Sequence, residues 1–168
     1  MEKAVSLTKR LIGLSMLLLM FFSGCTAAPR MDLKTSAVAV WDLENLNPKE
    51  AIGTDLGELL AAEVIETLKK SSSFQVVERQ RLILVLEELN LSSSAIVNDA
   101  TRLRIGRIVG ARFMVFGGYF VLGGMLRLDL RLVEVETGAI VKAAEKTAAA
   151  GDLNGWLKVA RQAAEELI

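Results

Sequence analysis

Residues 126–132 read LRLDLRL, in which each leucine but the last is followed by a charged residue. A period of two places the leucines on one face of a β-strand and Arg127, Asp129 and Arg131 on the other. Antiparallel sheets commonly bury one face and leave the other in water. This segment therefore predicts an antiparallel strand whose charged stripe forms a hydrated face of the sheet.

Turn residues bound this strand on both sides. Gly123-Gly124 before it is a two-residue hairpin signal, because glycine tolerates the positive φ that such a turn needs. Thr137-Gly138 after it predicts a second turn. The pattern thus predicts a meander of three strands, with the outer two at residues 112–122 and 139–149. Within the first of these, Gly117-Gly118 predicts a bulge or a bend.

The N-terminal half of the chain alternates strand and helix patterns. Ser36–Asp42 (SAVAVWD) is an apolar run typical of a strand that is covered on both faces. An amphipathic helix is predicted next, with a leucine or valine at every fourth position from Leu56 to Leu68 and an end near Lys69-Lys70. Phe74–Glu78 (FQVVE) then predicts a short strand.

Three more helices are predicted from apolar periodicity. One spans the leucines and valine of residues 82–89, and the next begins with Asp99 as its N-cap. Gly110 suits the left-handed C-cap of that second helix, and Gly106 predicts close packing of the helix on a sheet. The last helix of the chain carries Trp156 on its apolar stripe.

The predicted elements follow the order β-α-β-α-α-β-β-β-α. Crossovers early in the chain imply parallel neighbours, whereas the late meander is antiparallel. The fold class is therefore α/β: a mixed sheet of about five strands with helices packed on it. We expect one domain over residues 36–168, preceded by two N-terminal segments.

Composition opposes several classes of function. The 168 residues include 20 Lys+Arg and 20 Asp+Glu, so the chain lacks the positive excess with which proteins bind nucleic acid. The absence of histidine removes Ser-His-Asp triads, Cys-His pairs and common zinc motifs. Cys25 is the only cysteine, so no disulfide forms within one chain. We expect no enzyme activity, cofactor, metal or small-molecule substrate.

Residues 1–24 have the pattern of a secretion signal. A positive N-terminal region precedes Leu11–Phe22, an uncharged apolar run that is shorter than the roughly 20 residues of a stable membrane span. Phe22-Ser23-Gly24-Cys25 resembles a lipobox, which implies acylation of Cys25 and cleavage before it. The alternative is an uncleaved N-terminal anchor with an incidental free cysteine.

Acyl chains on Cys25 would hold the mature chain on a membrane, since each buried CH₂ contributes roughly 0.8 kcal/mol. Thr26 stands where an aspartate would retain a lipoprotein in the inner membrane, which by analogy favours the periplasmic face of the outer membrane. In a host without an outer membrane, the same signal implies the outer face of the plasma membrane. Residues 25–35 are predicted to be a lipidated tether, with a reach of at most ~35 Å.

Two charged groups are candidate functional residues. Asp42 and Glu44 lie at the carboxyl end of the first strand, where open α/β sheets often bind ligands, although loop structure or a subunit contact explains them as well. Glu78, Arg79 and Arg81 form a possible partner contact. The alternative for this run is a solvated junction between a strand and a helix.

Five segments together resemble the CsgG-like family, the curli production assembly/transport lipoproteins. They are Ala37–Asn45 (AVAVWDLEN), Leu56–Glu63 (LGELLAAE), Phe74–Arg81 (FQVVERQR), Ile105–Gly118 (IGRIVGARFMVFGG) and Leu126–Ile140 (LRLDLRLVEVETGAI). The resemblance implies a lipoprotein of the outer membrane with a periplasmic α/β domain. Founding members form rings that export curli subunits through a β-barrel pore.

This chain is similar to a reduced form of that family. Pore-forming members need two long hairpins whose membrane strands have about 9–11 residues each, but here tight Gly-Gly and Thr-Gly turns occupy those places. We therefore expect an assembly or secretion accessory protein that docks an unidentified protein partner or forms homo-oligomers. The alternative is a lipoprotein activator of a peptidoglycan synthase, for which the tether is short.

Overall fold

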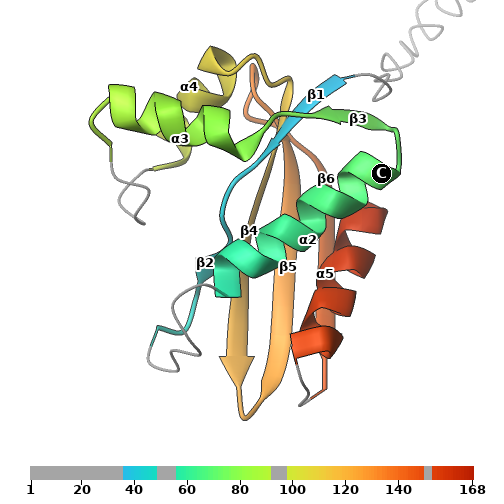
Figure 1. Ribbon diagram of the computed structural model, residues 1–168. Coiled ribbons are helices and arrows are strands. Elements are labelled where there is room, and N and C mark those ends of the chain that lie inside the picture. The colour runs from blue at the N-terminus through green and yellow to red at the C-terminus, as the bar shows by residue number, and fades with distance from the viewer. Residues whose placement is uncertain (1–35, 49–55, 92–97, 150–152) are drawn as a thin grey trace, which may run out of the picture. The chain divides into compact units, whose positions relative to one another are not determined.

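The computed structural model describes residues 36–48, 56–91, 98–149 and 153–168 (Figure 1). The strands are β1 (Ser36–Val40), β2 (Glu44–Asn45), β3 (Phe74–Val76), β4 (Phe113–Leu122), β5 (Met125–Glu134) and β6 (Ile140–Ala148). The helices are α2 (Leu56–Lys70), α3 (Arg79–Glu88), α4 (Asp99–Ile108) and α5 (Leu153–Glu166). The predicted order of elements is confirmed, with the short strand β2 added.

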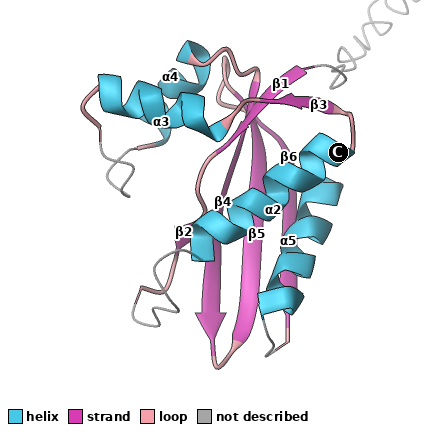
Figure 2. Cartoon of the chain, in the orientation of Figure 1, coloured by secondary structure: helices cyan, strands magenta, loops and turns pink. Residues whose placement is uncertain are grey.

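The strands form one mixed sheet in the order β3-β1-β4-β5-β6, as Figure 2 shows. β1 lies parallel to both β3 and β4, whereas β5 is antiparallel to β4 and β6. The parallel early strands and the antiparallel late meander match the prediction from the connections. β2 was not predicted; it pairs in parallel with the far half of β4, with Glu44 opposite Gly118.

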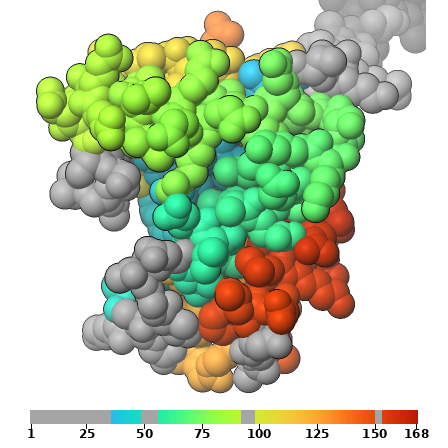
Figure 3. Space-filling model, viewed as in Figure 1, coloured from blue at the N-terminus to red at the C-terminus, as the bar shows by residue number. Residues whose placement is uncertain are grey.

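Two hydrophobic clusters lie on opposite faces of the sheet. Val38 and Val40 point toward α2 and α5, whereas Ala39 and Trp41 point toward α3 and α4. The first strand is therefore covered on both faces, as its continuous apolar run predicts. Trp156 is buried in the α5 layer, at 7% exposure. In Figure 3, α2 in green and α5 in red pack against each other over one face of the sheet.

The LRLDLRL stretch forms the centre of β5. Its four leucines are buried at 1% exposure or less, while Arg127 and Arg131 are exposed. On the hydrated face, Arg127 binds Asp129 within the strand and Glu145 on neighbouring β6, at 3.0 and 2.9 Å. The predicted wet face is confirmed, and its charges neutralise one another across the two strands.

Positive φ angles occur at the predicted turns. Gly123 and Gly124 have φ of +56° and +80° and close the β4–β5 hairpin directly, with Leu122 opposite Met125. Gly138 has φ of +72° in the turn before β6. No inserted hairpin is present at either described connection, which matches the expectation of a reduced family member.

Gly117-Gly118 was predicted to mark a bulge or a bend, and the structure shows no bulge there. The β4–β5 ladder runs through both glycines without a shift of register. A Cβ on Gly117 would lie 2.5 Å from the carbonyl oxygen of Asp129 and 3.0 Å from Cδ2 of Leu43, and one on Gly118 would lie 2.9 Å from Cγ of Leu46. The glycines therefore admit the side chains that flank β2. The register shift lies elsewhere, between β5 and β6 at Leu132 and Val133.

The N-cap of α4 also differs from the prediction. Asn98 caps the helix, because its Oδ1 accepts a hydrogen bond from the backbone N–H of Thr101 at 2.9 Å. Asp99 is the first helical residue, where its carboxylate still favours the helix N-terminus. Gly110 has φ of +76° beyond the end of α4, and a Cβ on Gly106 would lie 2.5 Å from Sδ of Met114. Both glycines have the predicted roles.

Among the described residues, no helix is both long and apolar enough to cross a bilayer. The predicted signal segment 1–24, the lipidation site Cys25 and the tether 25–35 lie outside the described residues. They remain predictions from the sequence.

Candidate functional site

An ion-pair cluster lies at the carboxyl end of β1. Arg79 donates from Nε to Oδ1 of Asp42 at 3.1 Å and from Nη2 to Oδ2 at 2.9 Å. Its Nη1 donates to Oε1 of Glu58 at 2.8 Å. Because Asp42 follows β1, while Glu58 and Arg79 lie in the first turns of α2 and α3, one guanidinium joins three parts of the fold.

The arginine keeps its charge over the whole range of practical pH. Hydrogen bonding to the Asp42 carboxylate raises the pKa of Arg79 above its ordinary value, and the charge of Glu58 adds to this effect, while partial burial opposes it. About a third of the Arg79 side chain is exposed, so solvent screens part of the attraction. The two-pronged geometry fixes the start of α3 beside β1.

The predicted partner contact of Glu78, Arg79 and Arg81 does not form one continuous surface. Arg79 faces Asp42 and Glu58, whereas Glu78 and Arg81 are exposed at the start of α3. Glu78 lies 4.0 Å from Nζ of Lys69, and it makes no side-chain capping bond to α3. Glu78 and Arg81 therefore remain open to a partner, while Arg79 organises the adjacent surface.

A second cluster surrounds Trp41. The guanidinium carbon of Arg102 lies 5.5 Å from the centre of the Trp41 ring. Arg102 also forms an ion pair with Glu44 on β2, and its Nη1 lies 3.5 Å from Oδ1 of Asp99. Thus Asp42 and Glu44, noted together in the sequence, bind different arginines from different helices.

Arg102 was missed by the sequence analysis. It is only 7% exposed, and its Nε has no hydrogen-bond partner among the described residues. The available signal was its position, since Arg102 precedes Ile105 and Val109 at the spacing of one helix face. A charged residue on an otherwise apolar stripe indicates a buried ion pair, but the sequence does not show which carboxylate it meets.

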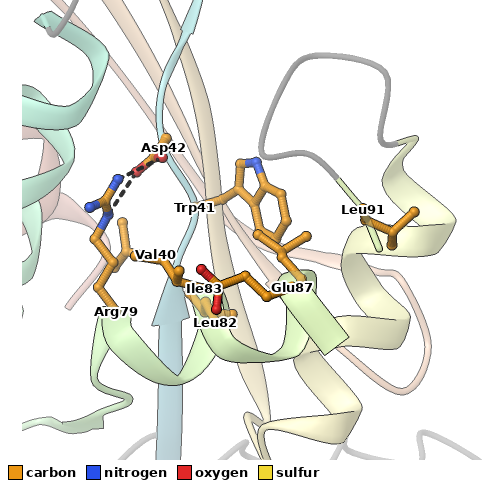
Figure 4. Close-up of a pocket in the computed structure, with 9 residues that line it drawn as sticks. Val40, Trp41, Asp42, Arg79, Leu82, Ile83, Glu87 and Leu91 are labelled. Atoms are coloured by element: carbon orange, nitrogen blue, oxygen red, sulfur yellow. Dashed lines mark hydrogen bonds and ion pairs between the residues drawn. The ribbon is translucent and has the colours of Figure 1, made fainter. Parts of the chain in front are cut away.

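A groove of about 360 Å³ lies between the end of β1 and α3. Its apolar lining residues are Val40, Trp41, Leu82, Ile83, Leu86 and Leu91, and its charged ones are Asp42, Arg79 and Glu87. Figure 4 shows the Asp42–Arg79 pair to one side of the groove and Leu91 to the other, with Glu87 extending from α3. The space-filling view shows the β1 end, in blue, within the hollow between α3 and α2 (Figure 3).

This geometry suits recognition by shape and charge. The volume lies near the lower end of the ~300–1,000 Å³ range of ligand pockets, enough for one or two apolar side chains. No group of three or more potential metal-ligating side chains occurs in the described part of the chain. The groove thus combines an apolar floor with a few fixed charges at its rim.

The family model described as "Curli production assembly/transport component CsgG" matches residues 25–122. The chain belongs to this family. The match covers more than half of the sequence, and it includes β1, the Arg79 and Arg102 clusters and the whole groove. No curated protein sequence matches the chain.

Solved structures show where else this CsgG-family fold occurs. The LpoB C-terminal domain from Salmonella enterica has a TM-score of 0.58 at 20% identity, covering 68% of this chain and 82% of that one. The LpoB C-terminal domain from Escherichia coli has a TM-score of 0.50 at 24% identity, with the same coverages. Lipoprotein GNA1162 from Neisseria meningitidis has a TM-score of 0.58 at 13% identity, covering 70% and 82%. At these identities the likeness establishes the fold.

Proposed function

We propose that this protein is a lipid-anchored accessory protein for assembly or secretion at the periplasmic face of the outer membrane. It is not an enzyme; it acts by docking a partner protein or by oligomerisation. Membership of the CsgG family is the observation that carries the proposal. The match to the family begins at Cys25, the residue predicted to be the lipid-carrying first residue of the mature chain.

The groove beside β1 supports docking as the mode of action. Asp42 and Arg79 hold each other at its rim, and the floor is apolar and preformed between β1 and α3. A preformed surface lowers the entropy lost when a partner binds. Acyl chains on Cys25 would keep this surface near the membrane, within the ~35 Å reach of the tether.

The first experiment tests whether acyl chains on Cys25 anchor the protein to a membrane. Mass spectrometry of the protein extracted from membranes is expected to show loss of residues 1–24 and addition of acyl chains to Cys25. The Cys25→Ala variant is expected to remain an unlipidated precursor. A wild-type chain without acyl chains would contradict the proposal.

The second measurement separates the two modes of action. Light scattering on a sizing column gives the molar mass of the lipidated protein in mild detergent. A discrete assembly of roughly eight or more subunits supports a closed ring. A monomer or dimer excludes the ring and leaves a tethered protein that binds a different partner, which includes the alternative of a peptidoglycan synthase regulator.

A further inference from the structure

We infer that the groove between β1 and α3 binds a cationic amphipathic segment of a partner protein, with an apolar side chain on the groove floor and a lysine or arginine at its acidic rim. The inference rests on the proposed docking function and names the chemistry of the partner at that site. It is carried by the charges fixed around the groove and by the composition of its floor.

The charges at the groove are predominantly negative. Three carboxylates, those of Asp42, Glu58 and Glu87, accompany the single guanidinium of Arg79 at or beside the lining. Trp41, which also lines the groove, contacts Arg102, and there Glu44 and Asp99 accompany the single guanidinium of Arg102. The lining itself thus carries two carboxylates, those of Asp42 and Glu87, against the single guanidinium of Arg79, and this excess attracts a cationic partner.

Glu87 is the rim carboxylate best placed to meet a partner. It is exposed, it lines the groove, and it forms no hydrogen bond or ion pair with any other residue that the structure describes. Asp42, in contrast, already accepts two hydrogen bonds from Arg79. A partner cation at Glu87 therefore adds an ion pair without breaking an existing one.

The floor explains why the partner must also be apolar. Leu82 and Leu86 are at most 6% exposed, and Ile83 beside them is partly exposed toward the groove. An aliphatic or aromatic side chain that enters this space displaces water from apolar surface, which contributes roughly 25 cal/mol per Å² buried. Amphipathic helices supply such anchors beside lysines at adjacent turns.

The test uses three dye-labelled helical peptides of about 14 residues. The first has leucines along one face and lysines on the flanking positions; the second replaces the lysines with glutamates, and the third replaces the leucines with alanines. Fluorescence anisotropy measures their binding to the full chain in nanodiscs of zwitterionic phospholipid, with empty nanodiscs as the blank. The lysine–leucine peptide is expected to bind at least about tenfold more tightly than the other two.

Matched variants of α3 locate the binding site. Glu87→Lys is expected to weaken binding of the lysine–leucine peptide by about three- to tenfold. Glu88→Lys changes the net charge by the same amount but outside the groove, and its affinity for the peptide is expected to stay within about twofold of the wild type. Ile83→Ser is expected to weaken binding, and Leu84→Ser, at an exposed neighbour, is not. Urea denaturation confirms that each variant is folded.

Three results would overturn the inference. Equal losses in Glu87→Lys and Glu88→Lys would show diffuse attraction, and equal losses in Ile83→Ser and Leu84→Ser would move the site off the groove. Failure to bind any peptide by a chain that is acylated at Cys25 contradicts this inference alone. If Cys25 is not acylated, the proposed function is contradicted, whereas the peptide-binding measurement still tests this inference on its own.

Discussion

The guanidinium of Arg102 lies over the ring of Trp41, with 5.5 Å between its central carbon and the ring centre, and Arg102 is only 7% exposed. Because Arg102 belongs to α4 and Trp41 follows β1, this contact ties the helix to the central region of the sheet. The ion pair with Glu44 extends the connection to β2.

Arg102→Ala is expected to lower the free energy of unfolding by roughly 2–3 kcal/mol, since it removes a cation–π contact, an ion pair and buried packing. Arg102→Met keeps most of the packing and is expected to cost less than about 1 kcal/mol. Urea denaturation of the two variants measures the difference. Equal losses would mean that charge, rather than packing, dominates at this position.

Arg79 and Asp42 are expected to couple by about 0.5–1 kcal/mol in a double-mutant cycle based on alanine, because their pair has two hydrogen bonds but is partly exposed. The pair of Lys69 and Glu78 is the control, with atoms 4.0 Å apart and side chains 40% and 71% exposed. Its coupling is expected to be below about 0.3 kcal/mol. A control coupling as large as that of Arg79 and Asp42 would contradict this explanation.

Gly57→Ala is expected to destabilise the protein by about 2 kcal/mol or more, although alanine favours helices. A Cβ at this position would lie 2.2 Å from the carbonyl oxygen of Leu43, so the start of α2 would have to move away from the chain before β2. Gly110→Ala adds a Cβ in open space and is expected to cost only about 1–2 kcal/mol, from its φ of +76°. Thermal unfolding of both variants tests the order.

Ionisation of Tyr119 is expected to lower the free energy of unfolding at alkaline pH. It is the only tyrosine and is 6% exposed, and burial raises the pKa of its phenol above the ordinary value of 10.0. Because the pKa is higher in the folded state, the contribution to stability is complete below pH 10.0 and is lost as pH rises through the folded-state pKa. Phenolate absorbance of the native protein is expected to titrate above pH 10.0.

Tyr119→Phe is the control for this titration. The variant is expected to lose less stability between neutral and strongly alkaline pH than the wild type, because phenylalanine has no proton to release in the unfolded state. Identical alkaline losses in the two proteins would show that other groups, such as lysines, account for the decline.

Elements with a regular period were predictable from the sequence. The alternation of residues 126–132 predicts β5, and the four-residue spacing from Leu56 to Leu68 predicts α2. The buried strand β1 follows from its unbroken apolar run. In each case the local pattern agrees with the tertiary environment, so local reasoning was sufficient.

Features that depend on contacts between distant segments were not predictable. β2 has two residues and no period, and it exists because Glu44 and Asn45 meet β4. Asp42 and Arg79 were each noted as candidates, but nothing in a sequence separation of 37 residues shows that they pair. The groove likewise exists only after α3 folds back over the end of β1.

The position of β1 between β3 and β4 has a consequence for synthesis. Val38 pairs with Phe113 in the second half of the chain, so the first strand formed has one unpaired edge until β4 has emerged. Long-range parallel pairing folds slowly, and a chain made from its N-terminus cannot complete this sheet early. The order of strands therefore delays completion of the sheet until β4 has been synthesised.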